Sequence, residues 1–277
     1  VPTVREHIVH HMVINILKPI IMKPMYEHSY GSIPGRGVHL GKKYIKKAIK
    51  KGGKDIKYVL KMDIKKYFDS IPHEKLKELF TRKIKDEKLL NLLNTLIDVN
   101  DDGIPLGFYT SQWFANWYLC NLDHYIKEQL HARYYYRYMD DMVIFGSNKR
   151  KLHRMRDAIE EELKILGLEM KDDWQVFRFE NNGKYRFLDF MGFRFYRNRI
   201  TIRRSIYYKM CRKAKKISKK RKPTIYDVRQ MLSYLGWLNA TDTYGAYIKW
   251  IKPYIIFRQL KKQVSKYDKM NKKGGNT

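Results

Sequence analysis

The sequence predicts an α+β fold, in which short antiparallel strands combine with amphipathic helices. Two strands rich in aromatic and β-branched residues flank a turn within residues 132–146, and another short strand at 57–63 ends in an aspartate. Helical patterns cover residues 73–98, and basic helices are expected over 204–265. The 277 residues, 44% of them hydrophobic, exceed one typical domain and can bury a sizeable core.

The helices expected in the first half of the chain have apolar residues at three- and four-residue intervals and end at proline or glycine. In order, they are residues 4–17 ending near Pro19, Gly41–Lys51, two helices within 73–98, and one from a Ser111 N-cap to about residue 130. The elements expected in the second half are a helix at Lys149–Leu166, short strands at 175–202 with a turn at Arg197–Arg199, a cation-rich helix at Lys209–Lys222, further helices at Thr224–Leu238 and Tyr244–Leu260, and a disordered tail at 266–277.

The most informative motif is Tyr138-Met139-Asp140-Asp141, which puts two adjacent carboxylates at the tip of the hairpin. Adjacent carboxylates repel each other and need a counter-charge, which Lys, Arg or Mg²⁺ can provide. Asp63 ends its own strand, so the three carboxylates could meet on neighbouring strands, as two-metal phosphoryl transfer requires. The alternative is an ordinary polar turn and a strand-terminal cap.

These motifs, in their order along the chain, resemble those of reverse transcriptases. Asp63–Phe68 is similar to the first catalytic motif of that family, and Tyr138–Asp141 to its Tyr-x-Asp-Asp motif. The other matching segments are Arg5–His11, Tyr30–His39, Ile104–Gln112, Leu166–Lys171 and Phe187–Phe193. Val1 is not an initiator methionine, and the resemblance begins at the end of a finger motif, so we expect the fingers to be short or incomplete in this chain.

The resemblance implies a right-hand polymerase with an RRM-like antiparallel palm sheet, partial fingers and a helical thumb. On this basis the expected regions are 1–56 for the partial fingers and palm entry, 57–203 for the palm with finger helices at about 73–105, 204–265 for the thumb, and 266–277 for the disordered tail.

The resemblance also implies roles for individual residues. Asp63 and Asp140 are expected to be catalytic and to bind two Mg²⁺ ions, with Mn²⁺ as an alternative, the Ile64 carbonyl as a further ligand and Asp141 in support. Phe68 is expected beneath the sugar, where it would disfavour a 2′-hydroxyl. The expected nucleotide-binding residues are Ile64, Tyr67, Phe68, Leu106, Gly107, Ser111, Gln112 and Lys171, and the expected primer and template contacts are Tyr138, Met139, Gly192 and Phe193.

Two departures from the family pattern suggest a subtype. Leu106 stands where most members have Gln, and Gln112 where most have Pro, a pattern similar to that of reverse transcriptases from diversity-generating retroelements. These enzymes misincorporate opposite template adenines, and loss of a polar contact at Leu106 would weaken discrimination. Alternatively, Leu106 only packs in a turn before a helix. The other candidates are a group II intron-, retron- or phage-defence-type enzyme and a non-catalytic RNA-binding protein.

The composition fits a polyanionic partner. There are 58 Lys and Arg against 28 Asp and Glu, giving a net charge of +30 and a pI of about 9.9. The expected partners are an RNA template and primer, dNTPs and, by resemblance, a small basic accessory protein; basic ribosomal and membrane-surface proteins would share these totals. No apolar run is long enough to span a bilayer, and only two cysteines are present, so we expect a cytoplasmic protein without a membrane partner.

Overall fold

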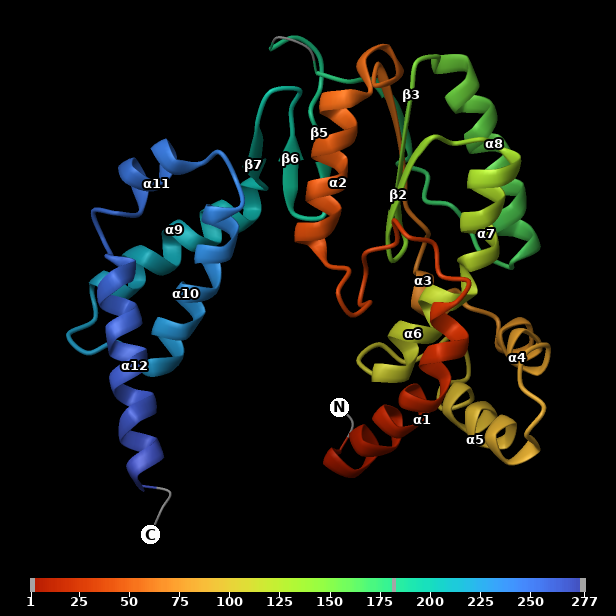
Figure 1. The fold of residues 1–277 in the computed structure, drawn as a ribbon, viewed down its shortest axis with the longest axis horizontal. Helices are drawn as coiled ribbons and strands as arrows, with labels where there is room; N and C mark the ends of the chain where they lie inside the picture. Colours follow the sequence, from red (N-terminus) through yellow and green to blue (C-terminus); the bar gives the residue numbers. More distant parts are fainter. Residues whose placement is uncertain (1–2, 181–182, 275–277) are drawn as a thin grey trace. The chain divides into compact units, whose positions relative to one another are not determined.

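The computed structural model of the 277-residue chain describes residues 3–180 and 183–274. The chain divides into two compact units. Unit 1 consists of Val1–Phe179 and Lys184–Arg186, and unit 2 consists of Glu180–Gly183 and Phe187–Thr277. Figure 1 labels their helices and strands. Each unit combines antiparallel strands with helices, which confirms the α+β class.

The sheet of unit 1 has four antiparallel strands in the order β2-β3-β1-β4. They are β1 (Tyr58–Met62), β2 (Tyr134–Tyr138), β3 (Asp141–Gly146) and β4 (Gln175–Arg178). Met62 is opposite Met142, and Tyr138 is opposite Asp141. The ends of β1 and β2 and the start of β3 therefore lie together, as the sequence predicted.

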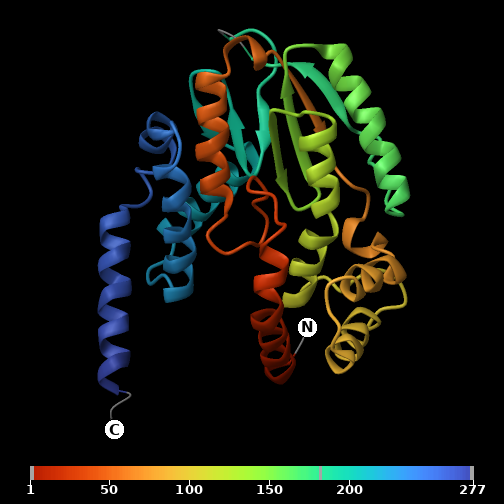
Figure 2. The same ribbon diagram turned by 45° about the vertical axis from the view of Figure 1, so that its right-hand side comes forward.

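Helices cover this sheet because its central strands are apolar on both faces. α8 (Lys149–Ile165) contacts β1, β3 and β4, and α2 (Val38–Lys51) contacts β2. Figure 2 shows α8 running along the strands. α8 buries Leu152, Met155, Ile159 and Leu163, whose spacing puts them on one face.

Figure 1 shows the remaining helices of unit 1 around the sheet, most of them beyond the end that carries the β2–β3 turn, with Cys120–His124 beside the strands. They are α1 (Val4–Met22), the 3₁₀ turn η1 (Gly53–Asp55) near the other end, α3 (Tyr67–Ser70), α4 (His73–Thr81), α5 (Glu87–Ile97), α6 (Tyr109–Tyr118), α7 (Cys120–His124) and the π-helical turn η2 (Tyr125–Gln129). Phe80 of α4 packs edge-on against Phe114 and Trp117 of α6, with ring centroids 4.8 and 4.9 Å apart.

Two helix predictions in unit 1 are wrong at their ends. α1 does not stop near Pro19 but continues to Met22, because the next turn buries Ile21 in the core and this burial offsets the cost of an internal proline. The helix predicted from Ser111 to about residue 130 begins earlier, at Tyr109, with Phe108 as the N-cap. The backbone at Leu119 leaves helical geometry (φ −89°, ψ 1°) and separates α6 from α7, and the last part continues from α7 as the π-helical turn η2.

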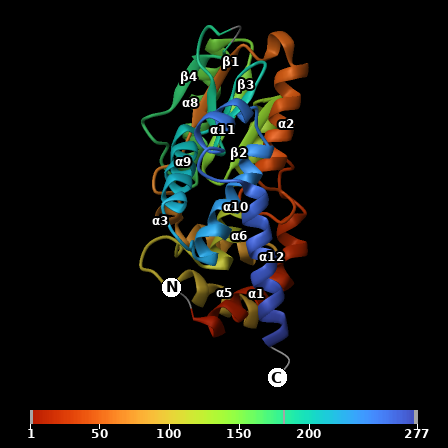
Figure 3. The same cartoon turned by 90° about the vertical axis from the view of Figure 1, so that its left-hand side faces the viewer.

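Unit 2 combines a three-stranded antiparallel sheet with four helices, and Figure 3 shows α9, α10 and α12 together. Its elements are β5 (Leu188–Phe190), β6 (Phe193–Phe195), β7 (Ile200–Ile202), α9 (Arg204–Ser218), α10 (Ile225–Asn239), α11 (Tyr244–Trp250) and α12 (Phe257–Gly274). α10 contacts both α9 and α12. Ile202 of β7 shares one apolar core with the helices, so β5–β7 fall in this unit, although the expected palm extends to residue 203.

The C-terminal predictions need two corrections. The single helix predicted at Tyr244–Leu260 is broken between α11 and α12, where Pro253 lacks the N–H that a continuous helix needs. The tail predicted to be disordered from residue 266 is helical through Gly274. Its first part is held on α10, because Arg229 pairs with Asp268 at 2.6 Å and lies over the Tyr267 ring. Residues 275–277 lie outside the described ranges.

Among the helices within the described ranges, none combines the length and the apolar character needed to cross a membrane.

Candidate active site

The register of unit 1 brings the predicted carboxylates to one end of its sheet. Asp63 follows β1 directly, Asp140 lies in the two-residue turn between β2 and β3, and Asp141 opens β3. Because Met62 is paired with Met142, the chain leaves β1 alongside the start of β3. Residues far apart in the sequence therefore meet in the way that the strand-end pattern predicted.

Lys171 is the cation closest to this carboxylate pair. Its Nζ donates a hydrogen bond to Asp63 Oδ1 at 2.6 Å, and its backbone N–H donates to the Asp63 carbonyl at 2.9 Å. The hydrogen bond to Asp63 raises the pKa of Lys171, so the ammonium stays charged. Lys171 thus lies at the site, as the resemblance implied.

Asp140 is the perturbed acid of the site. Loss of solvent around its carboxyl, and then the negative charge of Asp63, raise its pKa to about 6. Lys171 opposes this shift but does not cancel it. Asp63 and Asp140 together therefore carry more negative charge than Lys171 neutralises. Two carboxylates with such an excess are hard oxygen donors that fit a divalent cation such as Mg²⁺.

The backbone around Ile64 adds an oxygen on the same side. Ile64 pairs with Met170 in an antiparallel bridge, and the flanking bonds are Lys65 N–H to Glu169 O at 2.8 Å and Lys171 N–H to Asp63 O at 2.9 Å. This pattern turns the Ile64 N–H and C=O away from residues 169–171 and toward the β3 side of β1. A carbonyl in this position fits the predicted ligand set.

Asp141 is directed to a different partner. Its Oδ2 lies 3.6 Å from Lys61 Nζ, an ion pair across β3 and β1. Within the ranges that the structure describes, no three His, Cys, Asp or Glu side chains gather closely enough to hold a metal ion. The predicted three-carboxylate cluster is therefore present as the pair Asp63 and Asp140, with Asp141 set beside it by Lys61.

Phe68 and Leu106 lie at the surface where a nucleotide contact is expected. Phe68 is half-buried, and its carbonyl accepts a hydrogen bond from Ile104 N–H at 2.8 Å, which ties it to the segment that carries Leu106. Leu106 lies in a turn before α6, as the alternative expected, but its side chain is 70% exposed and so does not pack there. Gly107 follows with φ +102°, a conformation that favours glycine.

Three predicted nucleotide-contact residues have other surroundings in the structure. Tyr67 is buried, and its hydroxyl donates to the Ala115 carbonyl at 2.5 Å, so its side chain supports the site from the core. Ser111 is buried within the first turn of α6 and is not the N-cap. Gln112 is half-buried and accepts a hydrogen bond from the Ser32 hydroxyl at 2.9 Å. The side chains of Tyr67 and Ser111 are thus buried in this structure, and contact of these residues with a nucleotide stays a prediction.

The predicted primer-contact residues are divided between the units. Met139 is buried under the β2–β3 turn and Tyr138 is half-buried, both in unit 1. In unit 2, the Phe193 ring is buried against Trp237, with centroids 4.9 Å apart, and a Cβ at Gly192 would lie 2.6 Å from the same indole. The Phe193 side chain therefore belongs to the core of unit 2, and primer contact at Gly192 and Phe193 stays a prediction.

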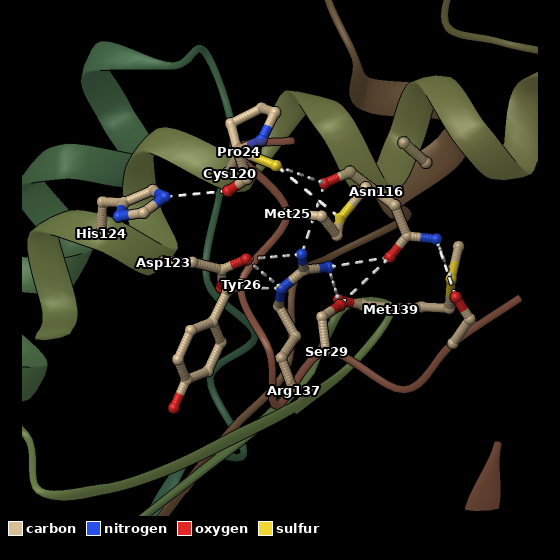
Figure 4. Close-up of polar contacts among 12 residues, drawn as sticks. Pro24, Met25, Tyr26, Ser29, Asn116, Cys120, Asp123, His124, Arg137 and Met139 are labelled. Carbon is tan, nitrogen blue, oxygen red and sulfur yellow. Dashed lines mark hydrogen bonds and ion pairs between the residues drawn. The ribbon is translucent and has the colours of Figure 1, made fainter. Parts of the chain in front are cut away.

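A buried polar network that the sequence patterns did not reveal lies beneath the β2–β3 turn and is drawn in Figure 4. Arg137 of β2 and Asp123 of α7 are both fully buried and form an ion pair at 2.6 Å. Asn116 of α6 joins them through a 3.2 Å hydrogen bond from Arg137 Nη1. A lone arginine among the aromatic residues of β2 was the signal that could have been followed, since buried charges need partners.

Comparison with known proteins identifies the family. A family model described as reverse transcriptase (RNA-dependent DNA polymerase) matches residues 1–195, so the chain belongs to the reverse transcriptase family. This confirms the resemblance from which the fold was predicted. Members of this family generally use divalent metal ions.

Similar proteins include a retron reverse transcriptase and an intron protein. The retron Ec73 reverse transcriptase of Escherichia coli is 27% identical over 168 residues, which cover 56% of this chain and 51% of the retron enzyme. An uncharacterized 91 kDa protein in the cob intron of Schizosaccharomyces pombe is 31% identical over 136 residues, 45% of this chain and 16% of that protein. The chain thus spans about half the length of the retron enzyme and a smaller part of the intron protein.

Solved structures support the same fold. The telomerase of Candida tropicalis, in complex with a TWJ fragment of telomeric RNA, superposes with a TM-score of 0.55 at 14% identity, covering 86% of this chain and 47% of the telomerase chain. At this identity the likeness establishes a polymerase-type fold and nothing about substrate.

Proposed function

We propose that this protein is an RNA-directed DNA polymerase that extends a primer at Asp63 and Asp140. The observation that supports the proposal best is the solvent-poor carboxylate pair with Lys171, at the end of β1 and of the β2–β3 hairpin, in a chain of the reverse transcriptase family. Its partners would be an RNA template, a primer and dNTPs, toward which the net charge of +30 is favourable.

The residues of the site would divide the chemistry as follows. Asp63, Asp140 and the Ile64 carbonyl would hold the divalent ions, which supply activation of the 3′-hydroxyl and charge neutralisation at the pyrophosphate. Lys171 would hold Asp63 in place and add positive charge on the leaving-group side. Asp141, which lies 3.6 Å from Lys61, would support the two carboxylates from beside them.

Within this function, we infer an error-prone enzyme of the diversity-generating type. Leu106 is exposed rather than packed, so it is available to a nucleotide or template base, and its apolar side chain offers no hydrogen bond there. A small basic accessory protein would then be an expected partner. The retron relative favours a second candidate, a retron- or intron-type enzyme, in which the chemistry is the same and the fidelity is higher.

The test is primer extension on an RNA template with dNTPs and Mg²⁺, followed by sequencing of the products. We expect extension that is lost in Asp140→Ala, with errors concentrated opposite template adenines. Leu106→Gln should lower the adenine errors, whereas Lys88→Gln on α5 serves as a remote control. Faithful extension by the unmodified protein would favour the retron or intron type, and RNA binding without extension would favour a non-catalytic RNA-binding protein.

A further inference from the structure

A buried arginine lies directly beneath the proposed catalytic turn. Arg137 is on β2, two residues before Met139, and is fully buried together with Asp123. Arg137 Nε lies 2.8 Å from Asp123 Oδ1, and Nη2 lies 2.6 Å from Oδ2, so the pair is bidentate. Tyr135 adds a hydrogen bond from its hydroxyl to Asp123 Oδ1 at 2.7 Å.

The other donors of the guanidinium reach the turn and α6. Nη1 donates to the Met139 carbonyl at 3.0 Å and to Asn116 Oδ1 at 3.2 Å, and Nη2 also donates to the Asn116 carbonyl at 3.3 Å. Figure 4 shows Arg137 at the centre of these contacts. One rigid, planar group therefore joins α6, α7 and the backbone that carries Asp140.

The turn that Arg137 contacts has an unfavourable backbone conformation. Met139 has φ +54°, in the left-handed region that a side chain disfavours. Asn116 Nδ2 lies 3.3 Å from Met139 Sδ and donates to the Gly31 carbonyl at 2.8 Å. Gly31 closes the turn from the other side, because an added Cβ there would lie 2.5 Å from Met139 Cγ and 2.8 Å from its backbone nitrogen.

We propose that Arg137 is a positioning residue for the polymerase reaction, which holds the Met139 carbonyl so that the turn presents Asp140 beside Asp63. The inference rests on the proposed function, in which Asp140 is catalytic. Folding alone does not account for the arrangement, since well-packed apolar residues often replace a buried ion pair without loss of stability. What apolar residues cannot replace is the hydrogen bond to the turn.

The main test is the triple variant Asp123→Leu, Tyr135→Phe, Arg137→Met. It removes the ion pair together with the hydroxyl that would lose its acceptor, so no buried charge is left unpaired. We expect kcat to fall about 100-fold, the effect of a small misplacement at a reacting centre. The KM for dNTP and the Kd for a primer–template duplex should stay within about twofold of the original values.

The matched control is the variant Asp55→Leu, Arg133→Met. It removes an exposed ion pair, 2.9 Å apart, near the opposite end of the same hairpin. This control should keep its kcat. Hydrogen exchange gives a readout that does not depend on activity: amides of residues 138–141 should exchange faster in the triple variant, whereas those of β1 should not.

Gly31→Ala is a second and independent test, because it displaces the same turn without touching the ion pair. Its control is Gly37→Ala, where an added Cβ meets nothing within 4 Å. If the triple variant does not fold, Gly31→Ala decides: a lower kcat with unchanged KM supports the proposal.

The proposal is overturned if a folded triple variant, or Gly31→Ala, keeps kcat within about threefold of its control. Asp140→Ala separates this result from failure of the proposed function: if that variant still extends primers, Asp140 is not catalytic and the proposed positioning falls with it.

Discussion

Among the residues of the candidate site, Asp140 is the one whose charged form most clearly destabilises the folded protein. Its folded pKa of about 6 exceeds the ordinary value of 3.8, because burial and Asp63 disfavour its charge. The folded protein thus binds this proton more tightly than the unfolded chain does. In the absence of metal, ionised Asp140 lowers the free energy of unfolding. This destabilisation is complete above pH 6 and disappears as the pH falls toward 3.8.

We therefore predict that Asp140→Asn stabilises the metal-free protein while abolishing extension. The free energy of unfolding at pH 8 should rise by about 1–3 kcal/mol, allowing for partial solvent screening. At pH 5 the gain should be roughly half as large, because the original carboxyl is then protonated in the folded state. Urea unfolding in a chelator, at both pH values, measures this.

The neighbouring carboxyl provides the control for this prediction. Asp141→Asn loses its attraction to Lys61 and should give no stabilisation. A gain for Asp140→Asn that grew as the pH was lowered would contradict the assigned direction of the pKa shift.

Phe68 gives a prediction about sugar selectivity. If its ring lies beneath the sugar of the incoming nucleotide, Phe68→Ala should make room for a 2′-hydroxyl and raise ribonucleotide incorporation at least about tenfold relative to dNTP. Phe68→Tyr keeps the ring and should keep the selectivity. Competitive incorporation of matched rNTP and dNTP measures the ratio, and an unchanged ratio in Phe68→Ala would refute the role.

The sequence predicted those site residues that lie at the ends of strands. Asp63 follows an apolar-alternating strand and Asp140 follows a strand rich in aromatic residues, so the pattern itself puts both at strand ends. Arg137 has only the weaker signal of a lone charge among the aromatic residues of β2, and Asp123 has none, because their ion pair forms only when α7 packs beneath β2. The burial of Tyr67 could not be predicted for the same reason, because an aromatic residue next to a motif gives no indication of whether its side chain faces the surface or the core.

At the scale of elements, the sequence predicted strands and amphipathic helices better than helix ends. Gly167 correctly marked the region where α8 ends, since its φ is +74°. Pro19 was expected to end α1, yet tertiary burial of Ile21 continues the helix. Pro253 does break the last predicted helix, so the effect of a proline depends on what the following turn can bury.

The corner between α9 and α10 supports a prediction about pH. Asp227 caps α10 with Thr224 and pairs with Lys213 and Lys220, and these hydrogen bonds hold its pKa well below the ordinary value. Asp227 therefore stabilises the folded protein at pH values above the pKa that it has in the unfolded chain. This stabilisation is lost as the pH falls through its pKa in the folded protein.

Asp227→Asn should destabilise this corner at pH 7. Hydrogen exchange of α10 amides should be faster at pH 7 than in the original protein, and the difference should shrink only in strong acid. Asp268→Asn, which removes an exposed pair on α12, is the matched variant and should leave the first turn of α10 unaffected. Equal effects of both substitutions would show that the capping box is not what stabilises α10.

At the scale of the whole molecule, the dominant property is charge. With 58 basic and 28 acidic residues, the protein repels itself, and a polyanion relieves this repulsion. Some of the acidic side chains already form ion pairs, such as Asp63 with Lys171 and Asp227 with two lysines. The net charge of +30 is therefore what an RNA–DNA duplex would meet.

Duplex binding should accordingly depend steeply on salt. If six or more phosphates are contacted, the affinity should fall about a thousandfold between 50 and 200 mM salt, because each contact releases condensed counterions. On α9 and just after it, Lys216→Gln and Lys219→Gln together should reduce the slope of log K against log salt by about two, whereas Lys85→Gln and Lys88→Gln near the start of α5 should leave it unchanged. Fluorescence anisotropy with a labelled duplex measures each slope. A shallow slope in the original protein would mean that stacking and not phosphate contact dominates binding, and equal slopes in both double variants would place the duplex elsewhere than on α9.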